Sequence, residues 1–274
     1  MTVPEVLLNN GIGIPQLGFG VWRVSHGATK PAVAAALDAG YRHIDTAKLY
    51  ANEDQVGAAI RESGLDRDAV FVTTKVWNDD QGYDATLRAF DTSMGLLGFD
   101  VLDLYLIHWP MPSRGLAADT WRAMERLYLD GRTRAIGVSN FQPEQLRRLL
   151  DTAEVVPAIN QVELHPYFQQ ASVRAANAEH DIVTEAWSPL AKGGELLHDP
   201  VVTALADKHD RTPAQVVIRW HLQMGTVAIP KSVTPSRIEE NFDVFGFELD
   251  KGDMTVMAGL DRGRRIGPNP DTLD

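Results

Sequence analysis

Eight short apolar runs separated by loops and helix-like stretches limit the fold of this chain more than any other feature. Most runs are continuously apolar, which is typical of strands buried on both faces. They span residues 41–45, 70–75, 101–108, 135–139, 158–163, 182–187, 226–230 and 242–247. Helices are expected over 53–63, 85–97, 120–130, 143–152, 171–179, 213–224 and from residue 235. This alternation predicts an α/β fold, a (β/α)8 TIM barrel of parallel strands.

The two ends of the chain lie outside this alternation. Val6-Leu7-Leu8, a turn at Asn9-Asn10-Gly11, and Ile12 with Ile14 predict an N-terminal β-hairpin that closes one end of the barrel. The glycine- and proline-rich tail over 262–274 predicts an irregular C-terminal loop across the rim. No linker or repeat interrupts the 274 residues, so we expect one domain over 1–274.

Composition excludes several classes of site and partner. The chain has no cysteine, which removes disulfides, thiolate nucleophiles and cysteine metal ligands. Its net charge of −11 disfavours binding to nucleic acid or to anionic membranes. The N-terminal stretch lacks the pattern of a secretory signal and no run is long enough to span a membrane. We therefore expect a soluble, cytoplasmic protein that binds a small molecule.

Four polar residues stand at or just beyond the ends of three predicted strands. Asp45, Lys75 and His108 close their runs, and Tyr50 lies one short loop after the first. In a parallel barrel the C-terminal strand ends converge on one open face, where chemistry takes place. Each residue alone could be an ordinary polar group at a strand end, but together the four predict a catalytic site.

The chemistry of these four residues favours proton donation to a carbonyl substrate. A tyrosine has an ordinary pKa of about 10, and a neighbouring Lys75 ammonium is expected to lower the pKa of Tyr50. Asp45 would keep Lys75 charged and in place, and His108 would donate a hydrogen bond to the carbonyl oxygen. Such a site suits hydride addition to C=O followed by protonation of the alkoxide.

Three other functions remain open on these residues alone. His43, Asp45, Lys75, His108 and His165 could belong to a metal-dependent hydrolase, although neither an HxH pair nor an HExxH motif occurs. Lys75 could form a Schiff base in an aldolase. The fold could also serve a cofactor-binding sensor without turnover.

Longer motifs carry a resemblance to a known family. The stretch over 40–47 reads GYRHIDTA and continues through YANE at 50–53. Further matches are LIHWP at 106–110, AIGVSNF at 135–141, and IPKS at 229–232 followed by Arg237, Glu240 and Asn241. Over nearly its full length the chain resembles the aldo-keto reductase superfamily, and most of all the small bacterial branch that includes 2,5-diketo-D-gluconate reductases.

This resemblance implies a role for each matching residue. Tyr50 would be the general acid, tuned by Lys75 and Asp45, and His108 would orient the carbonyl. Ser139, Asn140 and Gln161 would hold a nicotinamide carboxamide, because hydroxyl and amide groups both donate and accept. Trp187 would stack on the ring, and Ser188, Leu190 and Gly193 would face the pyrophosphate. Asn140 as a loop cap, Gln161 as an interior polar group and Trp187 as core packing remain alternatives.

A basic pair at residues 231 and 237 predicts the phosphate end of the cofactor site. Lys231 and Arg237 flank a predicted helix start at Thr234-Pro235, and a helix N-terminus with adjacent cations binds anions. We interpret it as the clamp for the 2′-phosphate of NADPH, with Ser232, Glu240 and Asn241 beside it. NADH is possible as a weaker alternative, and a solvated surface pair is the structural alternative.

Aromatic and glycine positions complete the predicted site. Gly18-Phe19-Gly20 lacks the third glycine of a dinucleotide-binding motif and precedes the first predicted strand. By resemblance, Gly20 and Trp22 instead lie in a loop at the active site, and Trp22, Trp77 and Trp109 wall the substrate pocket.

Arg262, Arg264 and Arg265 in the C-terminal tail could favour an acidic substrate or be solvated. The family resemblance implies a monomer.

Overall fold

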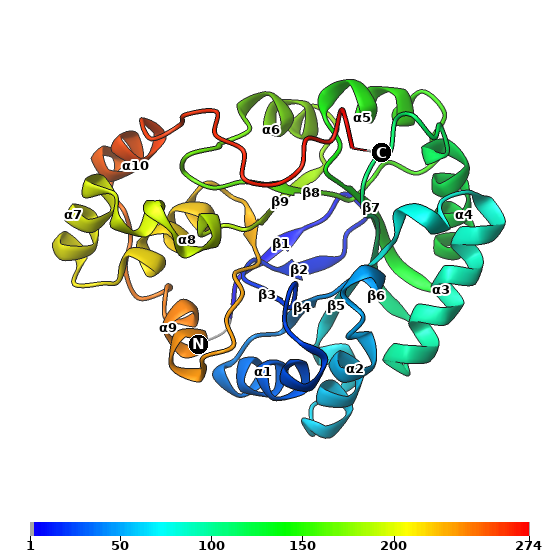
Figure 1. Ribbon diagram of the computed structural model, residues 1–274, viewed down its shortest axis with the longest axis horizontal. Helices are drawn as coiled ribbons and strands as arrows, with labels where there is room; N and C mark the ends of the chain where they lie inside the picture. The colour runs from blue at the N-terminus through cyan, green and yellow to red at the C-terminus, as the bar shows by residue number, and fades with distance from the viewer. Residues whose placement is uncertain (1–2, 274) are drawn as a thin grey trace.

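The computed structural model describes residues 3–273, and within them eight parallel strands form one sheet in sequence order. The strands are β3 (Phe19–Gly20), β4 (His43–Asp45), β5 (Phe71–Val76), β6 (Leu102–Ile107), β7 (Thr133–Ser139), β8 (Ile159–Glu163), β9 (Val183–Trp187) and β10 (Val227–Ala228). A parallel bridge between Leu17 and Ala228 joins the two edges of the sheet and closes it. The predicted barrel is confirmed (Figure 1).

Helices lie around the outside of the barrel (Figure 1). They are α1 (His26–Ala39), α2 (Glu53–Glu62), α3 (Tyr83–Leu97), α4 (Ala117–Leu129), α5 (Pro143–Leu150), α6 (Ala171–Ala178), α7 (Pro200–His209), α8 (Pro213–Gln223), α9 (Pro235–Phe242) and α10 (Lys251–Ala258). On α4, Trp121, Met124 and Leu127 are buried at helical spacing, while Arg122 and Arg126 face solvent. No helix among residues 3–273 is long and apolar enough to cross a membrane.

An antiparallel hairpin closes the barrel at the N-terminal ends of its strands. It consists of β1 (Glu5–Leu7) and β2 (Gly13–Pro15), joined by the predicted turn. Leu8 and Ile14 of this segment are buried in one apolar cluster with interior residues of the strands, including Leu104 and Ala135. The predicted closure of this end by the hairpin is confirmed.

One predicted strand is wrong and one real strand was not predicted. Residues 242–247 are the end of α9 and a loop, in which Phe242 packs on the Tyr41 ring at a centroid distance of 4.9 Å. Their apolar side chains face the helical layer outside the barrel rather than a neighbouring strand. The eighth strand is instead β3, whose two residues pair with Ile44 and Asp45.

The sequence pattern also missed α1, α7 and α10. Pro31 lies within α1, where it interrupts the pattern expected of a helix. The start of α7 nevertheless carries a recognisable signal, because Asp199 caps it and Pro200 follows. The predicted start of α8 is confirmed, since Thr212 and Gln215 form a reciprocal capping box.

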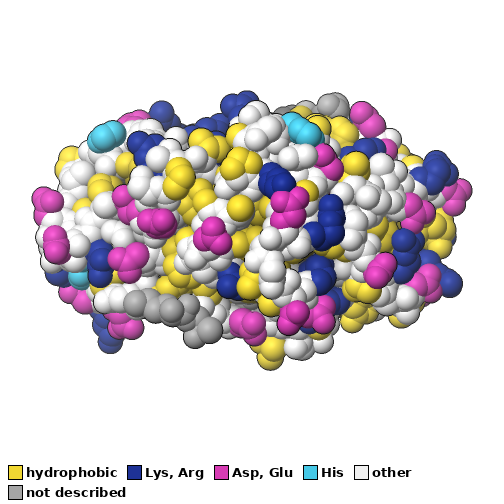
Figure 2. All heavy atoms as spheres, turned by 90° about the horizontal axis from the view of Figure 1, so that it is seen from below, with side chains coloured by type: hydrophobic (Ala, Val, Ile, Leu, Met, Phe, Trp, Pro, Cys, Tyr) yellow, Lys and Arg dark blue, Asp and Glu magenta, His cyan; other side chains and the backbone are white. Residues whose placement is uncertain are grey.

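Charges on the outer surface are mixed in sign. On the face shown in Figure 2, acidic and basic side chains are interspersed rather than gathered into one extended patch. This distribution gives that face no continuous basic area for a polyanion.

Candidate active site

A buried ion pair between Lys75 and Asp45 forms the floor of the site. The Lys75 ammonium lies 2.8 and 2.7 Å from the two Asp45 carboxylate oxygens and donates a third bond, of 2.9 Å, to the Thr46 carbonyl. Both side chains are almost fully buried. An ammonium has three N–H donors, and these three acceptors use all of them. The Schiff-base alternative is disfavoured, because such an amine is not free to attack a carbonyl.

Tyr50 and His108 lie directly beside this ion pair. Tyr50 ends a 3₁₀ turn (Lys48–Tyr50) that follows β4, and its ring centroid is 5.3 Å from the Lys75 nitrogen. The His108 ring, just beyond β6, meets the Tyr50 ring edge to face at 5.8 Å. The four residues that the sequence singled out therefore come together at one end of the barrel.

The pKa of Tyr50 moves in the direction opposite to the prediction. Burial, together with the negative charges of Asp45 and Glu185, raises the pKa of Tyr50 well above its ordinary value. The expectation that Lys75 lowers the pKa of Tyr50 is therefore wrong. The ammonium is directed at Asp45 and Thr46, so its charge is compensated before it reaches the phenol. Tyr50 consequently stays protonated at physiological pH.

His108 is held neutral by its surroundings. Burial and the positive charge of Lys75 lower the pKa of His108 well below its ordinary value. A neutral imidazole has one N–H donor and one acceptor nitrogen. It can donate a hydrogen bond to an oxygen without carrying a charge into the site.

A second polar group lies in and just beyond the C-terminal parts of β7, β8 and β9, at the same end of the barrel. Ser139 donates from its hydroxyl to the Gln161 carbonyl at 2.8 Å, and the Asn140 amide nitrogen lies 3.0 Å from that hydroxyl oxygen. The Trp187 indole nitrogen donates to the Asn140 side-chain oxygen at 2.8 Å. Asn140 sits in the left-handed region at φ 67°.

Gln161 connects this group to the ion pair. Its amide nitrogen donates to Asp45 at 2.8 Å and to Glu185 at 2.9 Å. Its side-chain oxygen has no hydrogen bond to any residue between 3 and 273. The two carboxyl groups fix the orientation of the amide, so that its oxygen is available to a ligand.

Glu185, which the sequence pattern did not single out, is fully buried beside the ion pair of Lys75 and Asp45. Its second carboxyl oxygen lies 3.6 Å from the His43 ring nitrogen. Burial and the charge of Asp45 raise the pKa of Glu185 to about 8, because one ammonium cannot balance two carboxylates. A charged residue inside the predicted strand over 182–187, two positions before Trp187 and thus on the same face, is the signal that could have identified it.

Replacing Glu185 by glutamine should make stability less dependent on pH. The pKa of Glu185 rises on folding from 4.5 to about 8, so the native state binds more protons than the unfolded state between these values and stability falls as pH increases. Glutamine cannot ionise, so Glu185→Gln should lose less stability than wild type between pH 5 and pH 8. We expect a difference of roughly 2 to 4 kcal/mol in the free energy of unfolding. Urea denaturation at both pH values measures it, and parallel changes in the two proteins would contradict the assignment.

Two unpaired cations lie where the phosphate end was predicted. Lys231 and Arg237 are exposed and take part in no ion pair within residues 3–273, although most other arginines there do. Arg237 is on the first turn of α9, and Ser232 accepts from the Thr234 backbone N–H at 3.1 Å just before that helix. Glu240 accepts a hydrogen bond from the Thr212 hydroxyl, and Asn241 is buried. The predicted cofactor contacts of these residues stay predictions.

The remaining predicted cofactor residues lie on the loops after β3 and β9. Ser188 is in the left-handed region, and Leu190 and Gly193 follow it into a 3₁₀ turn (Ala191–Gly193). Gly20 ends β3 and donates its backbone N–H to the Pro230 carbonyl at 3.1 Å. These loops lie at the same end of the barrel as Tyr50, and their contacts with a cofactor stay predictions.

The three predicted pocket tryptophans differ in exposure. Trp22 is 37% exposed, with Arg23 over its ring at 4.4 Å and Lys192 at 5.9 Å. Trp77 is half-buried and meets His108 edge to face at 5.1 Å. Trp109 is only 7% exposed, so it offers little surface to a substrate.

The tail arginines fasten the C-terminal segment to the barrel. Arg262 and Arg264 both pair with Glu195, and Arg262 also pairs with Asp199. Arg265 lies over the Phe168 ring at 4.6 Å, and burial lowers its pKa. Arg262 and Arg264 therefore pair with carboxylates of this chain while their side chains stay partly exposed.

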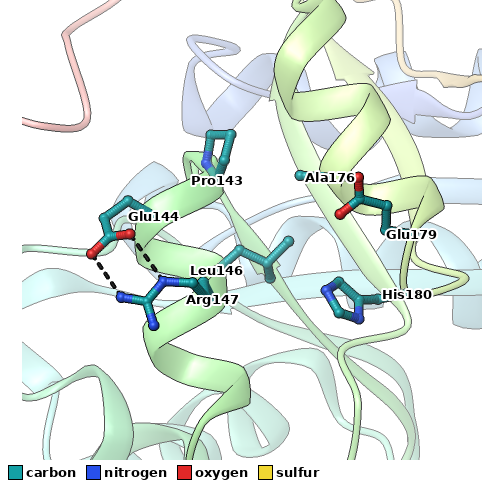
Figure 3. A pocket seen from close by; sticks show the side chains of 7 residues that line it. All are labelled: Pro143, Glu144, Leu146, Arg147, Ala176, Glu179 and His180. Carbon is teal, nitrogen blue, oxygen red and sulfur yellow. Dashed lines mark hydrogen bonds and ion pairs between the residues drawn. The ribbon is translucent and has the colours of Figure 1, made fainter.

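A surface hollow lies away from this polar cluster. It has a volume of about 350 Å³ and lies between α5 and α6, where Glu144 pairs with Arg147 and His180 stands opposite (Figure 3). It brings together no unpartnered buried polar group. Within residues 3–273 no cluster of three metal-ligating side chains occurs.

Comparison with known proteins agrees with this geometry. A family model described as the Aldo/keto reductase family matches residues 11–262. This chain belongs to the aldo/keto reductase family. An aldo-keto reductase of Mycobacterium sp. (strain KMS) is 56% identical over 274 residues, covering 100% of this chain and 99% of that protein.

One further named relative and one solved structure are also similar to this chain. The methylglyoxal reductase DkgA of Salmonella typhimurium is 50% identical over 99% of this chain and 98% of its own length. The crystal structure of a Gox0644 mutant in complex with NADPH matches with a TM-score of 0.96 and 49% identity, covering 100% of both chains. The predicted family is confirmed. The structure of the Gox0644 mutant holds a nicotinamide cofactor.

Proposed function

We propose that this chain reduces aldehyde or ketone carbonyls to alcohols with NADPH, by direct hydride transfer and with Tyr50 as the general acid. The observation that carries the proposal is the convergence of Tyr50, Lys75, Asp45 and His108 at the C-terminal ends of the strands. Membership of the aldo/keto reductase family and the NADPH complex of a 49% identical structure support it.

Each catalytic residue has a task that follows from its environment. His108, neutral at working pH, donates a hydrogen bond that orients the carbonyl oxygen. Tyr50 keeps its proton until the oxygen becomes an alkoxide, which is a far stronger base than a phenolate. Lys75 and Asp45 hold one another rigidly beneath the phenol, with the Lys75 nitrogen 5.3 Å from its ring centroid.

The residues present fit a nicotinamide cofactor bound across the strand ends. The free Gln161 oxygen and the Ser139 hydroxyl would hold a carboxamide, and the half-buried Trp187 would offer a flat face. The unpaired Lys231 and Arg237 would hold a 2′-phosphate, which favours NADPH over NADH. When bound, the reduced cofactor supplies the hydride.

A carbonyl panel followed by NADPH absorbance tests the proposal. It includes methylglyoxal, aromatic aldehydes and diketo-sugar acids, each with NADPH and with NADH. We expect consumption of NADPH with at least one carbonyl, and a lower kcat/KM with NADH. Tight NADPH binding without turnover on any carbonyl would instead favour a sensor built on this fold.

A further inference from the structure

The C-terminal tail folds back over the end of β8 and is held there by Glu163. This side chain is fully buried, and its carboxylate accepts from the backbone N–H of Ile266 at 2.6 Å and of Gly267 at 2.8 Å. The His165 ring nitrogen lies 3.0 Å from the same carboxylate. A carboxylate has only acceptor oxygens, so it can satisfy both backbone donors at once. The tail runs from α10 past α6 toward α5 (Figure 1).

Gly267 lies directly against the indole of Trp187. A methyl group added at Gly267 would overlap the benzo ring of Trp187 and lie 2.8 Å from a Glu163 carboxylate oxygen. The indole nitrogen, next to the benzo ring atoms that Gly267 approaches, donates to Asn140. Trp187 is thus held at its nitrogen by Asn140 and contacted on its benzo ring by the tail.

Other contacts hold the tail in this place on both sides of Gly267. Lys192 donates to the Ile266 carbonyl at 3.0 Å, and Gln145 donates to Asp271 at 2.9 Å. These contacts fix the tail as a whole, whereas the two bonds to Glu163 fix the residue that contacts the indole. Glu163 and Trp187 are also direct neighbours in the pairing of β8 with β9.

We propose that Glu163 and Gly267 are positioning residues of the nicotinamide subsite, which together fix the Trp187 indole as a stacking surface. This inference rests on the proposed function. Glu163 sets the path of the tail, and the missing side chain of Gly267 allows the backbone to lie against the indole. The tail is then a part of the cofactor site, although neither residue touches the reacting atoms.

Two substitutions disturb this arrangement in different ways. Glu163→Gln keeps the size of the side chain but turns an amide NH₂ toward one of the two backbone donors, which loses that hydrogen bond. Gly267→Ala keeps the carboxylate and both backbone donors, but its methyl group overlaps the Trp187 indole and crowds Glu163, which pushes the tail and the indole apart. Gly95→Ala in α3, where an added methyl group meets nothing within 4 Å, is the matched control.

The test compares binding of the whole cofactor with binding of its adenosine half. Titration of the full-length protein gives Kd for NADPH and for 2′,5′-ADP, which lacks the nicotinamide. In Glu163→Gln and Gly267→Ala we expect Kd for NADPH to rise about tenfold, with Kd for 2′,5′-ADP within about twofold of wild type. Gly95→Ala should change neither, and circular dichroism checks that each variant is folded.

Two outcomes would overturn the inference. An equal loss of affinity for NADPH and for 2′,5′-ADP would mean that the variants damage the fold in general. An unchanged NADPH affinity in both variants would mean that the tail does not fix the position of the Trp187 indole. A failure of the proposed function has a different signature, because wild type itself would then either fail to bind NADPH or bind it without turnover of any carbonyl in the panel. Two variants with unlike chemistry keep the test decisive if one of them fails to fold.

Discussion

Replacing Tyr50 by phenylalanine should lower kcat for carbonyl reduction by about 10²-fold to 10⁴-fold, the range typical of losing a positioned proton donor. The phenol is the protonated group beside Lys75 and His108, and phenylalanine preserves its ring and its packing against both. The Kd for NADPH should stay within about twofold of wild type, because the tyrosine oxygen is required only by the reacting substrate.

The matched control for this substitution is Tyr128→Phe, which removes a hydroxyl on α4, outside the barrel. It should leave kcat unchanged. Steady-state kinetics with a carbonyl from the panel, together with NADPH titration, measure both variants. A Tyr50→Phe protein that keeps the wild-type kcat would remove Tyr50 from the role of general acid.

Replacing Arg237 by alanine should raise KM for NADPH by roughly 10-fold to 100-fold, as expected for the loss of hydrogen bonds between charged groups. The KM for NADH should change by less than about threefold, because that cofactor has no 2′-phosphate. Arg237 is exposed and unpaired within residues 3–273, so its removal leaves no buried carboxylate without a partner.

Arg148→Ala is the control for Arg237→Ala, since Arg148 is an exposed arginine on α5 that pairs with Glu144 on the same helix. It should leave both KM values unchanged. Kinetics with the two cofactors at fixed ionic strength separate the cases. An equal rise of KM for NADPH and NADH in Arg237→Ala would remove the 2′-phosphate interpretation.

Most of the barrel could be predicted from the sequence, because strands buried on both faces leave continuous apolar runs. β5, β6 and β8 lie within one residue of the predicted bounds. β3 has only two residues, one of them glycine, and its barrel contacts depend on partners distant in sequence. The apolar residues over 242–247 indicate burial, but they do not say whether a sheet or a helical layer covers them.

The site could be predicted as a set of residues but not as an electrostatic system. The positions of Asp45, Tyr50, Lys75 and His108 follow from the rule that parallel strand ends converge. The pKa of Tyr50 depends on its burial and on the charges of Asp45 and Glu185, which come from two different strands. Both depend on register and side-chain packing, which composition and spacing do not encode.

The most direct test of the account uses NADPH that carries deuterium at both hydrogens of the dihydronicotinamide C4. Mass spectrometry of the alcohol formed in unlabelled water should find one deuterium, located on the former carbonyl carbon, with wild type. The hydroxyl proton comes from Tyr50 and ultimately from solvent, so it carries no label. Alcohol without deuterium on that carbon would contradict direct hydride transfer and the mechanism built on it.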